Sequence, residues 1–216
     1  MKYIYLSVSL LLLLSSLKAQ NEVPSSFFPP KMILKYSPIN LLDFNTPGIT
    51  FSLEHYLTEN HYLHHEISFL SDLGYTRYEE QPLIGVRLRT GYRVYYRELY
   101  DDGPSNPFLE VLIKYKHTYQ KKTSTYSRFD GLFFEDITTR IRTTSMGIYV
   151  AWGQQYYLSP RLTIEWGTTL GLRFLNKASL DVPPDAERPL LTFDLEDGNH
   201  TFPSTFLLFK VGYVLK

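Results

Sequence analysis

The sequence predicts an all-β protein, an eight-stranded antiparallel up-and-down transmembrane β-barrel. Three observations predict it: segments that alternate between an apolar and a polar face, connections that alternate between short and long, and glycines gathered on the polar face. Alternation with a period of two is typical of a strand between two different environments. Short turns at one end and long loops at the other are typical of barrels in the outer membrane.

The first nineteen residues are expected to be a secretory signal peptide. Lys2 gives a basic start, residues 4–14 form a mainly apolar run, and residues 15–19 are small and polar ahead of Gln20. That run is about half as long as the roughly 20 apolar residues of a membrane helix. We therefore expect a signal peptide over 1–19, a periplasmic linker over 20–30 and an outer-membrane barrel over 31–216.

Eight segments are expected to form the strands, and most are long enough to cross a membrane at a tilt. In the second, Ile49 and Phe51 alternate with Thr50. The fourth alternates tyrosine and aliphatic residues with four arginines, and the seventh alternates apolar residues with threonine, glycine and charge. In chain order the segments are 31–41, 49–57, 62–70, 83–97, 107–119, 139–157, 161–175 and 204–215.

The connections between these segments alternate in length after the second strand. The short ones are 58–61, 98–106 and 158–160, and the long ones are 71–82, 120–138 and 176–203. With an even number of strands both ends of the barrel fall on the periplasmic side, so the long loops face outward. Only the first outer loop, 42–48, is short.

Seven of the twelve glycines lie within the expected strands, always on the face that carries charge. On a surface that faces water, a strand glycine weakens the strand and packs nothing. In a narrow closed barrel it makes room, so the charged face is expected to point inward. These lumen glycines are Gly85, Gly91, Gly147, Gly153, Gly167, Gly171 and Gly212.

The same inward face carries charges of both signs. An eight-stranded barrel is just wide enough for side chains to fill, and buried charges must pair. We therefore expect the glutamates to pair with arginine and lysine and to block the lumen. The alternative is a narrow pore, which the excess of cations would make anion-selective. The expected network is Lys35, Glu54, Glu66, Arg87, Arg89, Arg93, Arg97, Glu110, Lys114, Lys116, Glu165, Arg173 and Lys210.

A soluble lipocalin-like carrier of lipid in the periplasm is a second alternative, with the apolar face turned inward. The glycine pattern and the long loops on one rim favour the membrane barrel. So do aromatic residues near strand ends on the apolar face, which could form interfacial girdles. They are Tyr96, Tyr115, Trp152, Trp166, Phe174, Phe209 and Tyr213.

Two segments carry a resemblance to a known family. The run NLLDFNTPGITFSLEHYLTENHYLHHEISF, marked by Asn40, Asp43, Pro47 and Gly48, resembles the opening of small outer-membrane barrels of Bacteroidota, a family of unknown function. The segment GVRLRTGYRVYYRELYDDGPSNPFLEVLIKYKHTY is similar to their middle hairpin. The resemblance implies an OmpA-like or OmpX-like barrel and no chemistry. It also implies recognition by the barrel-insertion machinery through a terminal aromatic residue, whereas this chain ends on Lys216.

No catalytic residue, metal site or cofactor is predicted. The chain has no cysteine, which excludes disulfides and thiolate chemistry. A lipid A-modifying barrel enzyme is the remaining catalytic alternative, with His117 near Ser124 and Ser127, or His200 near Ser204, as candidates. His64 is expected inside the barrel beside Glu66, and His65 outside.

The expected partners follow from location and charge. Without Lys2 and Lys18, 20 of the 22 basic residues remain against 22 acidic ones, so the chain lacks the basic surface that nucleic acid requires. Outer-membrane lipid, lipopolysaccharide and an unidentified surface or envelope protein are the expected contacts. The outer loops offer an apolar cluster, Leu132, Phe133 and Phe134, which could instead fold over the barrel mouth. They also offer carboxylates, expected to be solvated rather than to bind divalent cations: Asp181, Asp185, Glu187, Asp194, Glu196 and Asp197.

Overall fold

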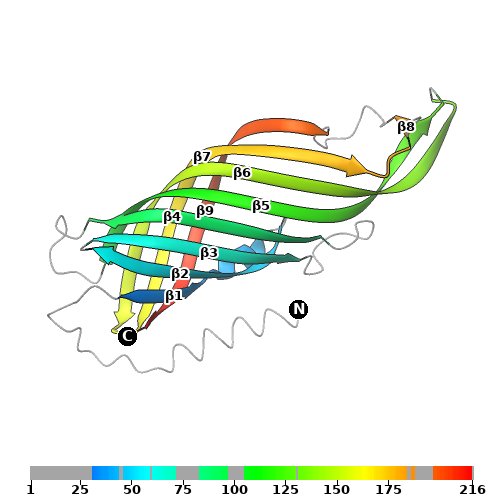
Figure 1. The fold of residues 1–216 in the computed structure, drawn as a ribbon. Helices are drawn as coiled ribbons and strands as arrows, with labels where there is room; N and C mark the ends of the chain where they lie inside the picture. The colour runs from blue at the N-terminus through cyan, green and yellow to red at the C-terminus, as the bar shows by residue number, and fades with distance from the viewer. Residues whose placement is uncertain are drawn as a thin grey trace, which may run out of the picture.

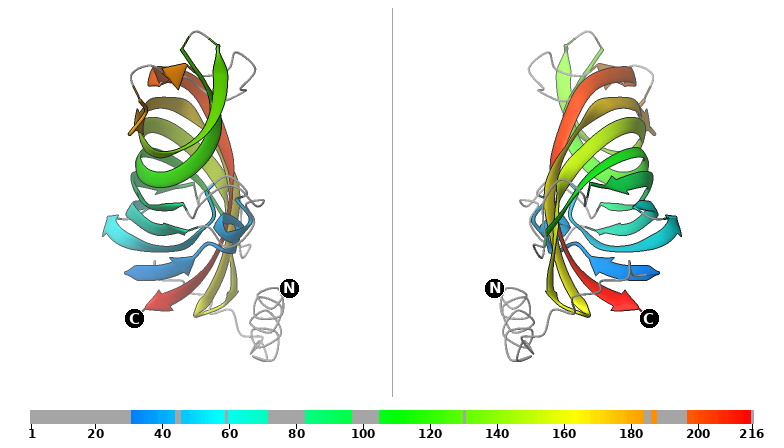
Figure 2. Two further views of the ribbon diagram at one scale, coloured as in Figure 1. Left: turned by 90° about the vertical axis from the view of Figure 1, so that its right-hand side faces the viewer. Right: turned by 90° about the vertical axis from the view of Figure 1, so that its left-hand side faces the viewer.

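The computed structural model describes residues 31–43, 46–58, 60–71, 83–96, 105–129, 131–183, 186–187 and 197–215. Eight antiparallel strands form one closed ring, which confirms the predicted fold class (Figures 1 and 2). A two-residue strand, β8, adds to the far part of β5. The strands are β1 Met32–Tyr36, β2 Gly48–Thr58, β3 His61–Ser71, β4 Ile84–Tyr95, β5 Ser105–Arg128, β6 Phe133–Ser159, β7 Leu162–Leu180, β8 Ala186–Glu187 and β9 Gly198–Leu215.

The first and last strands close the ring. Met32 of β1 is the register partner of Leu215 in β9, and β4 pairs with β5 along its whole length. The start of β1 and the end of β9 therefore lie together at one end of the barrel, which we call the terminal end. We call the opposite end the far end; there β5, β6, β7 and β9 extend well past the other strands (Figure 1).

The first strand is shorter than the predicted segment 31–41. It ends at Tyr36, and a 3-10 helix, η1, covers Pro38–Leu42. Proline has no backbone N–H for the strand ladder, and it suits the first turn of a helix. The amide side chain of Asn40 in η1 donates to Oγ1 of the fully buried Thr50 at 3.0 Å. The helix therefore rests against the inner face of β2, near the far end.

The prediction that 120–138 and 176–203 are loops is wrong over much of their length. β5 runs on to Arg128 and β6 begins at Phe133, so the first becomes a long hairpin with a short turn at Gly131, whose φ is +90°. β7 continues to Leu180, and β9 begins at Gly198. In the β5–β6 hairpin, Thr123, Thr125, Tyr126 and Thr138 are residue types that favour strands. The extensions lack a continuous apolar face, so alternation in the sequence did not reveal them.

The two faces of the ring differ as predicted. Leucine, isoleucine, valine and phenylalanine stand exposed on the outside of all eight strands, while charged side chains are buried inside. The aromatic residues expected on the apolar face are outward too, and six of the seven are clearly exposed. Trp166 pairs with Phe209 toward the terminal end, and Tyr115 and Phe174 flank Met146 farther along. In the part of the chain described above, no helix is long and apolar enough to span a membrane.

A small apolar cluster lies inside the barrel between layers of charge, and it depends on the glycines. Tyr149 is 1% exposed, and its ring occupies the space beside Gly147 and Gly171. A Cβ on Gly147 would lie 2.6 Å from the Tyr149 ring and 2.8 Å from the carbonyl oxygen of Leu172. One on Gly91 would collide with the Glu110 carboxylate. The other predicted lumen glycines are in similar contact with neighbouring strands: Gly85, Gly153, Gly167 and Gly212.

We predict that Gly147→Leu lowers the unfolding free energy of the barrel by about 1–3 kcal/mol, which is the usual effect of overpacking an interior. The new side chain would meet the Tyr149 ring and the backbone of β7, and the backbone cannot give way without breaking the ladder. Urea unfolding of the protein in lipid vesicles measures the change. Val150→Leu on the outward face of the same strand is the control, because Val150 is 40% exposed and has room. Equal midpoints for both variants would show that the lumen is not crowded at Gly147.

Candidate functional site in the lumen

Arg93, on β4, is the centre of the buried network toward the terminal end. Its side chain is fully buried and reaches three carboxylates. One terminal nitrogen lies 2.6 Å from Glu110, and the other lies 2.8 Å from Glu54 and 2.7 Å from Glu165. The guanidinium also stacks over the Phe108 ring, 3.9 Å from its centroid. A single cation thus joins strands β2, β4, β5 and β7 across the lumen.

A lysine on β1 completes this layer. Lys35 Nζ lies 2.6 Å from Glu54 and 2.6 Å from Glu165, and it donates to the Gln155 side chain at 2.5 Å. The hydroxyl of Tyr95 donates to Glu54 at 2.8 Å. Two cations therefore share three carboxylates, and neutral donors and acceptors fill the remaining positions. We call this group the terminal layer.

His64 links the terminal layer to the next charges along the axis. Its Nδ1 lies 2.8 Å from Glu110, and Lys210 Nζ lies 2.8 Å from its Nε2. Lys210 also contacts Glu66 at 2.9 Å, and Glu66 accepts a hydrogen bond from Arg89 at 3.2 Å. His64 lies inside as expected, but its closest acid is Glu110 of β5 rather than Glu66.

The charges nearest the far end are unbalanced. Arg87 approaches only Asp43, at 3.9 Å, and Lys114, Lys116 and Arg173 have no carboxylate within 4.0 Å among the described residues. Lys114 instead packs over the Phe206 ring at 4.4 Å, and Arg173 packs over Phe202 at 4.6 Å. We call Arg87, Arg89, Lys114, Lys116 and Arg173 the far cluster.

Twelve of the thirteen residues expected to line the lumen lie inside the barrel, while Arg97 falls outside the described residues. All four glutamates pair with cations, whereas three of the cations have no acidic partner within the segments that the structure describes. Sequence reasoning missed the neutral members Tyr95 and Gln155. The sequence could have identified them, because strand alternation places Tyr95 on the same face as Arg93 and Gln155 on the inward face of its strand. It also missed Asp43, which only the turn of η1 brings to Arg87.

The histidine and serine pairs considered for catalysis are too far apart. His117 and Ser124 belong to the same extended strand seven positions apart, and His200 and Ser204 are four positions apart. At about 3.3 Å per residue, these spacings far exceed hydrogen-bond reach. Nδ1 of His117 contacts Thr144 instead, at 2.8 Å. Ser127 is farther from His117 still.

The acidic residues beyond the barrel rim are used within the chain. Arg140 contacts Asp181 at 2.6 Å, and its hydrogen bond lowers the pKa of that carboxyl. Asp197 accepts from the backbone N–H and the hydroxyl of Ser179. No group of three or more metal-binding side chains occurs in the described segments. Of the other loop carboxylates, Glu187 belongs to β8, whereas Asp185, Asp194 and Glu196 lie outside the described residues.

The apolar cluster at the end of the β5–β6 hairpin does not fold over the barrel mouth. Leu132 is 83% exposed and Phe134 is 66% exposed. Phe133 packs against Phe129, with ring centroids 5.5 Å apart and the ring planes tilted by 38°, so the group makes contacts of its own. Figure 1 shows the hairpin reaching past the far end of the ring. We call Phe129, Leu132, Phe133 and Phe134 the hairpin tip.

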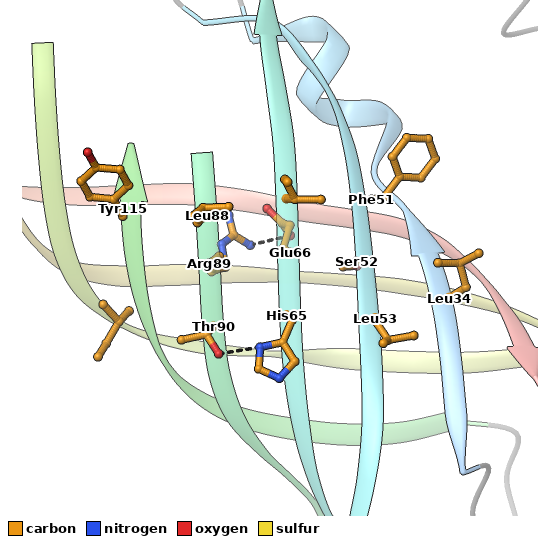
Figure 3. A pocket seen from close by; sticks show the side chains of 12 residues that line it. Leu34, Phe51, Ser52, Leu53, His65, Glu66, Leu88, Arg89, Thr90 and Tyr115 are labelled. Atoms are coloured by element: carbon orange, nitrogen blue, oxygen red, sulfur yellow. Dashed lines mark hydrogen bonds and ion pairs between the residues drawn. The ribbon is translucent and has the colours of Figure 1, made fainter. Parts of the chain in front are cut away.

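The outer surface over β1–β5 contains a shallow, mainly apolar hollow. Figure 3 shows His65 and Thr90 on neighbouring strands among the lining residues, joined by a hydrogen bond of 2.8 Å. Its apolar walls include Leu34, Phe51 and Leu88. The Arg89–Glu66 pair belongs to the same strands but to their inward face. His65 is thus outward, as expected, with its ring nitrogen satisfied.

Two solved structures are similar to this chain. One is the crystal structure of Neisserial surface protein A (NspA), with 10% identity, a TM-score of 0.40, and 85% of this chain and 94% of that chain covered. The other is the crystal structure of the N-terminal β-barrel domain of Pseudomonas aeruginosa OprF, with 11% identity, a TM-score of 0.33, and 85% and 97% covered. No protein-family model matches the chain, and no curated protein does.

We predict that Arg93→Met costs about 3–5 kcal/mol of unfolding free energy, because it leaves three buried glutamates short of a cation. Urea titration in lipid vesicles gives this value. Arg140→Met removes an equally short ion pair, but one that is exposed on both sides, so its midpoint should stay close to that of the unmodified protein. A small effect at Arg93 would contradict the central role of this residue.

Proposed function

We propose that this protein is a non-enzymatic outer-membrane barrel whose lumen is closed by ion pairs and whose hairpin tip makes contacts outside the cell. The observation that carries the proposal is the inside-out distribution of side chains. Charge is buried within the ring, and large apolar side chains stand exposed around it. In water such an exposed apolar surface would associate, whereas lipid covers it.

The direction of the chain supports an orientation in the membrane. Both termini of the described barrel lie at the terminal end, where the connections between β2 and β3 and between β6 and β7 are short. In outer-membrane barrels this end faces the periplasm. The far end, with the long extensions and the hairpin tip, would then face outward. Export through the signal peptide 1–19 and the linker role of 20–30 remain proposals, since both lie outside the described residues.

The closed lumen favours a structural or binding role over a pore. The terminal layer fills the cross-section with side chains that contact one another at 2.5–3.0 Å. An ion would have to separate these pairs to pass, and separating a buried pair is costly. The barrel therefore acts as a rigid support for its outer segments. Barrel insertion requires the usual cellular machinery, and lipid and lipopolysaccharide are the proposed surroundings.

The hairpin tip is the part of the outer region best suited to a contact. Its apolar side chains are exposed and held apart from the ring by two paired strands, and Phe129 packs against Phe133. Binding residues on rigid supports of this kind are common in proteins. A lipid surface is the contact that these side chains fit best, since they offer area and few hydrogen-bond groups.

We expect the full chain, expressed in a Gram-negative host, to be recovered in the outer-membrane fraction and to migrate faster on a gel before boiling than after it. The closed ladder keeps the barrel compact in detergent until heat opens it. Recovery as a soluble periplasmic protein with no change on boiling would favour the lipocalin-like alternative. In a planar bilayer we expect no discrete conductance steps, and regular steps would favour the pore.

We predict that replacing Leu132, Phe133 and Phe134 with serine weakens binding to phospholipid vesicles at least tenfold. Each large apolar side chain contributes about 1.5–3 kcal/mol when buried. Flotation of the barrel in nanodiscs with phosphatidylethanolamine–phosphatidylglycerol vesicles measures this binding. A matched variant with serine at Thr123, Thr125 and Thr138, on the same hairpin, should float like the unmodified protein. Vesicle binding that survives loss of the tip would rule out this contact.

A further inference from the structure

The far cluster places like charges directly opposite one another on neighbouring strands. Arg87 is the register partner of Lys116, and Arg89 is the register partner of Lys114. Like charges in directly opposed positions destabilise a sheet. Two such pairs follow one another on the same inward face. The arrangement opposes folding unless something negative compensates it.

The fifth member of the far cluster comes from a third strand. Gly147 of β6 is the register partner of both Lys114 and Arg173, so these two cations stand on either side of a position without a side chain. The cluster thus converges from β4, β5 and β7 on one part of the lumen wall. Glu66 and Asp43 are the carboxylates that approach it among the described residues. Glu66 contacts Arg89 and Lys210 through Oε2, while its buried Oε1 has no hydrogen-bond partner there. Asp43 contacts Thr46 and lies 3.9 Å from Arg87.

Donor groups in the cluster are left without partners. Arg89 is 4% exposed, yet among the described residues its Nε has no hydrogen-bond acceptor, and the buried Nε of Arg173 has none there either. Buried donors of charged groups are normally satisfied, so each unpaired one calls for an explanation. Lys114, Lys116 and Arg173 are partly exposed, and a ligand for the cluster would have to reach them from the far end. The terminal layer blocks approach from the other side.

We propose that the far cluster binds a compact oxyanion of the phosphate type. Arginine and lysine recognise such groups through charge-assisted hydrogen bonds, and an arginine Nε together with a terminal nitrogen suits two oxygens at once. The narrow lumen admits only a small group. The phosphate is either free in solution or carried on a lipid headgroup that enters from the outer leaflet. This site is separate from the hairpin tip, and it requires only the barrel fold.

The test uses the full barrel folded in phosphate-free nonionic detergent and titrated with inorganic phosphate in a calorimeter. We expect one saturable site, with affinity reduced at least tenfold in Lys116→Gln and in Arg173→Gln. Lys121→Gln is the matched control, because Lys121 lies on the same strand but is exposed on the outward face. Affinity equal in all four proteins, or no saturable binding of phosphate or of the lipid probe below, would overturn the proposal.

A second measurement separates binding from folding. Without anion, Lys116→Gln should unfold at higher urea than the unmodified protein, since it removes the repulsion with Arg87. Added phosphate should raise the midpoint of the unmodified protein and leave that of the variant nearly unchanged. A midpoint that falls on replacing Lys116 would show that the lysine serves only to hold the fold, and would contradict the proposal.

A third comparison identifies the source of the phosphate. Dihexanoyl phosphatidic acid offers the same terminal phosphate on a short lipid, and dihexanoyl phosphatidylcholine covers that phosphate with a choline. Equal affinity for inorganic phosphate and phosphatidic acid would assign a free anion. Binding of phosphatidic acid alone would assign a headgroup. Equal binding of phosphatidylcholine would mean that the acyl chains rather than the phosphate are recognised, which would refute the oxyanion site.

Discussion

The narrow interior of an eight-stranded ring is the constraint on which the rest of this structure depends. Closure removes the sheet edges, but it leaves an interior only as wide as the side chains that fill it. Most inward positions are therefore polar groups with partners, packed apolar side chains or glycines. Arg93 pairs with three carboxylates, Tyr149 covers Gly147 and Gly171, and Gly91 leaves room for Glu110.

This constraint explains how much the sequence could predict. Strand parity assigns a side chain to a face, so alternation placed Glu54 and Arg93 on one face, and the glycines on that face identified it as the inward one. Which charges meet depends on register between strands that are distant in sequence, such as His64 with Glu110 of β5. Beyond the apolar band alternation is lost, and the polar strand around Thr123 resembled a loop. Pro38 was the local signal for the early end of β1, and its effect was overlooked.

Charge is distributed unevenly along the axis, although the whole chain is formally neutral. The terminal layer holds Lys35 and Arg93 against Glu54, Glu110 and Glu165, so it is close to balance. The far cluster holds five cations near Glu66 and Asp43. A lumen that only needed to be closed could repeat the balanced layer throughout. The separation of the two layers indicates that the far part of the lumen has a different task from the terminal part.

The two layers also respond differently to loss of a charge, and this difference distinguishes support from binding. Removing a cation from the terminal layer leaves buried carboxylates without a partner, so stability must fall. Removing Lys116 from the far cluster relieves a repulsion, so stability should not fall in the absence of an anion. A residue whose removal stabilises the empty protein does not hold the fold, and stability is commonly lower where residues serve a function. By that reasoning the terminal layer supports the barrel, and the far cluster is the part of the lumen adapted to a ligand.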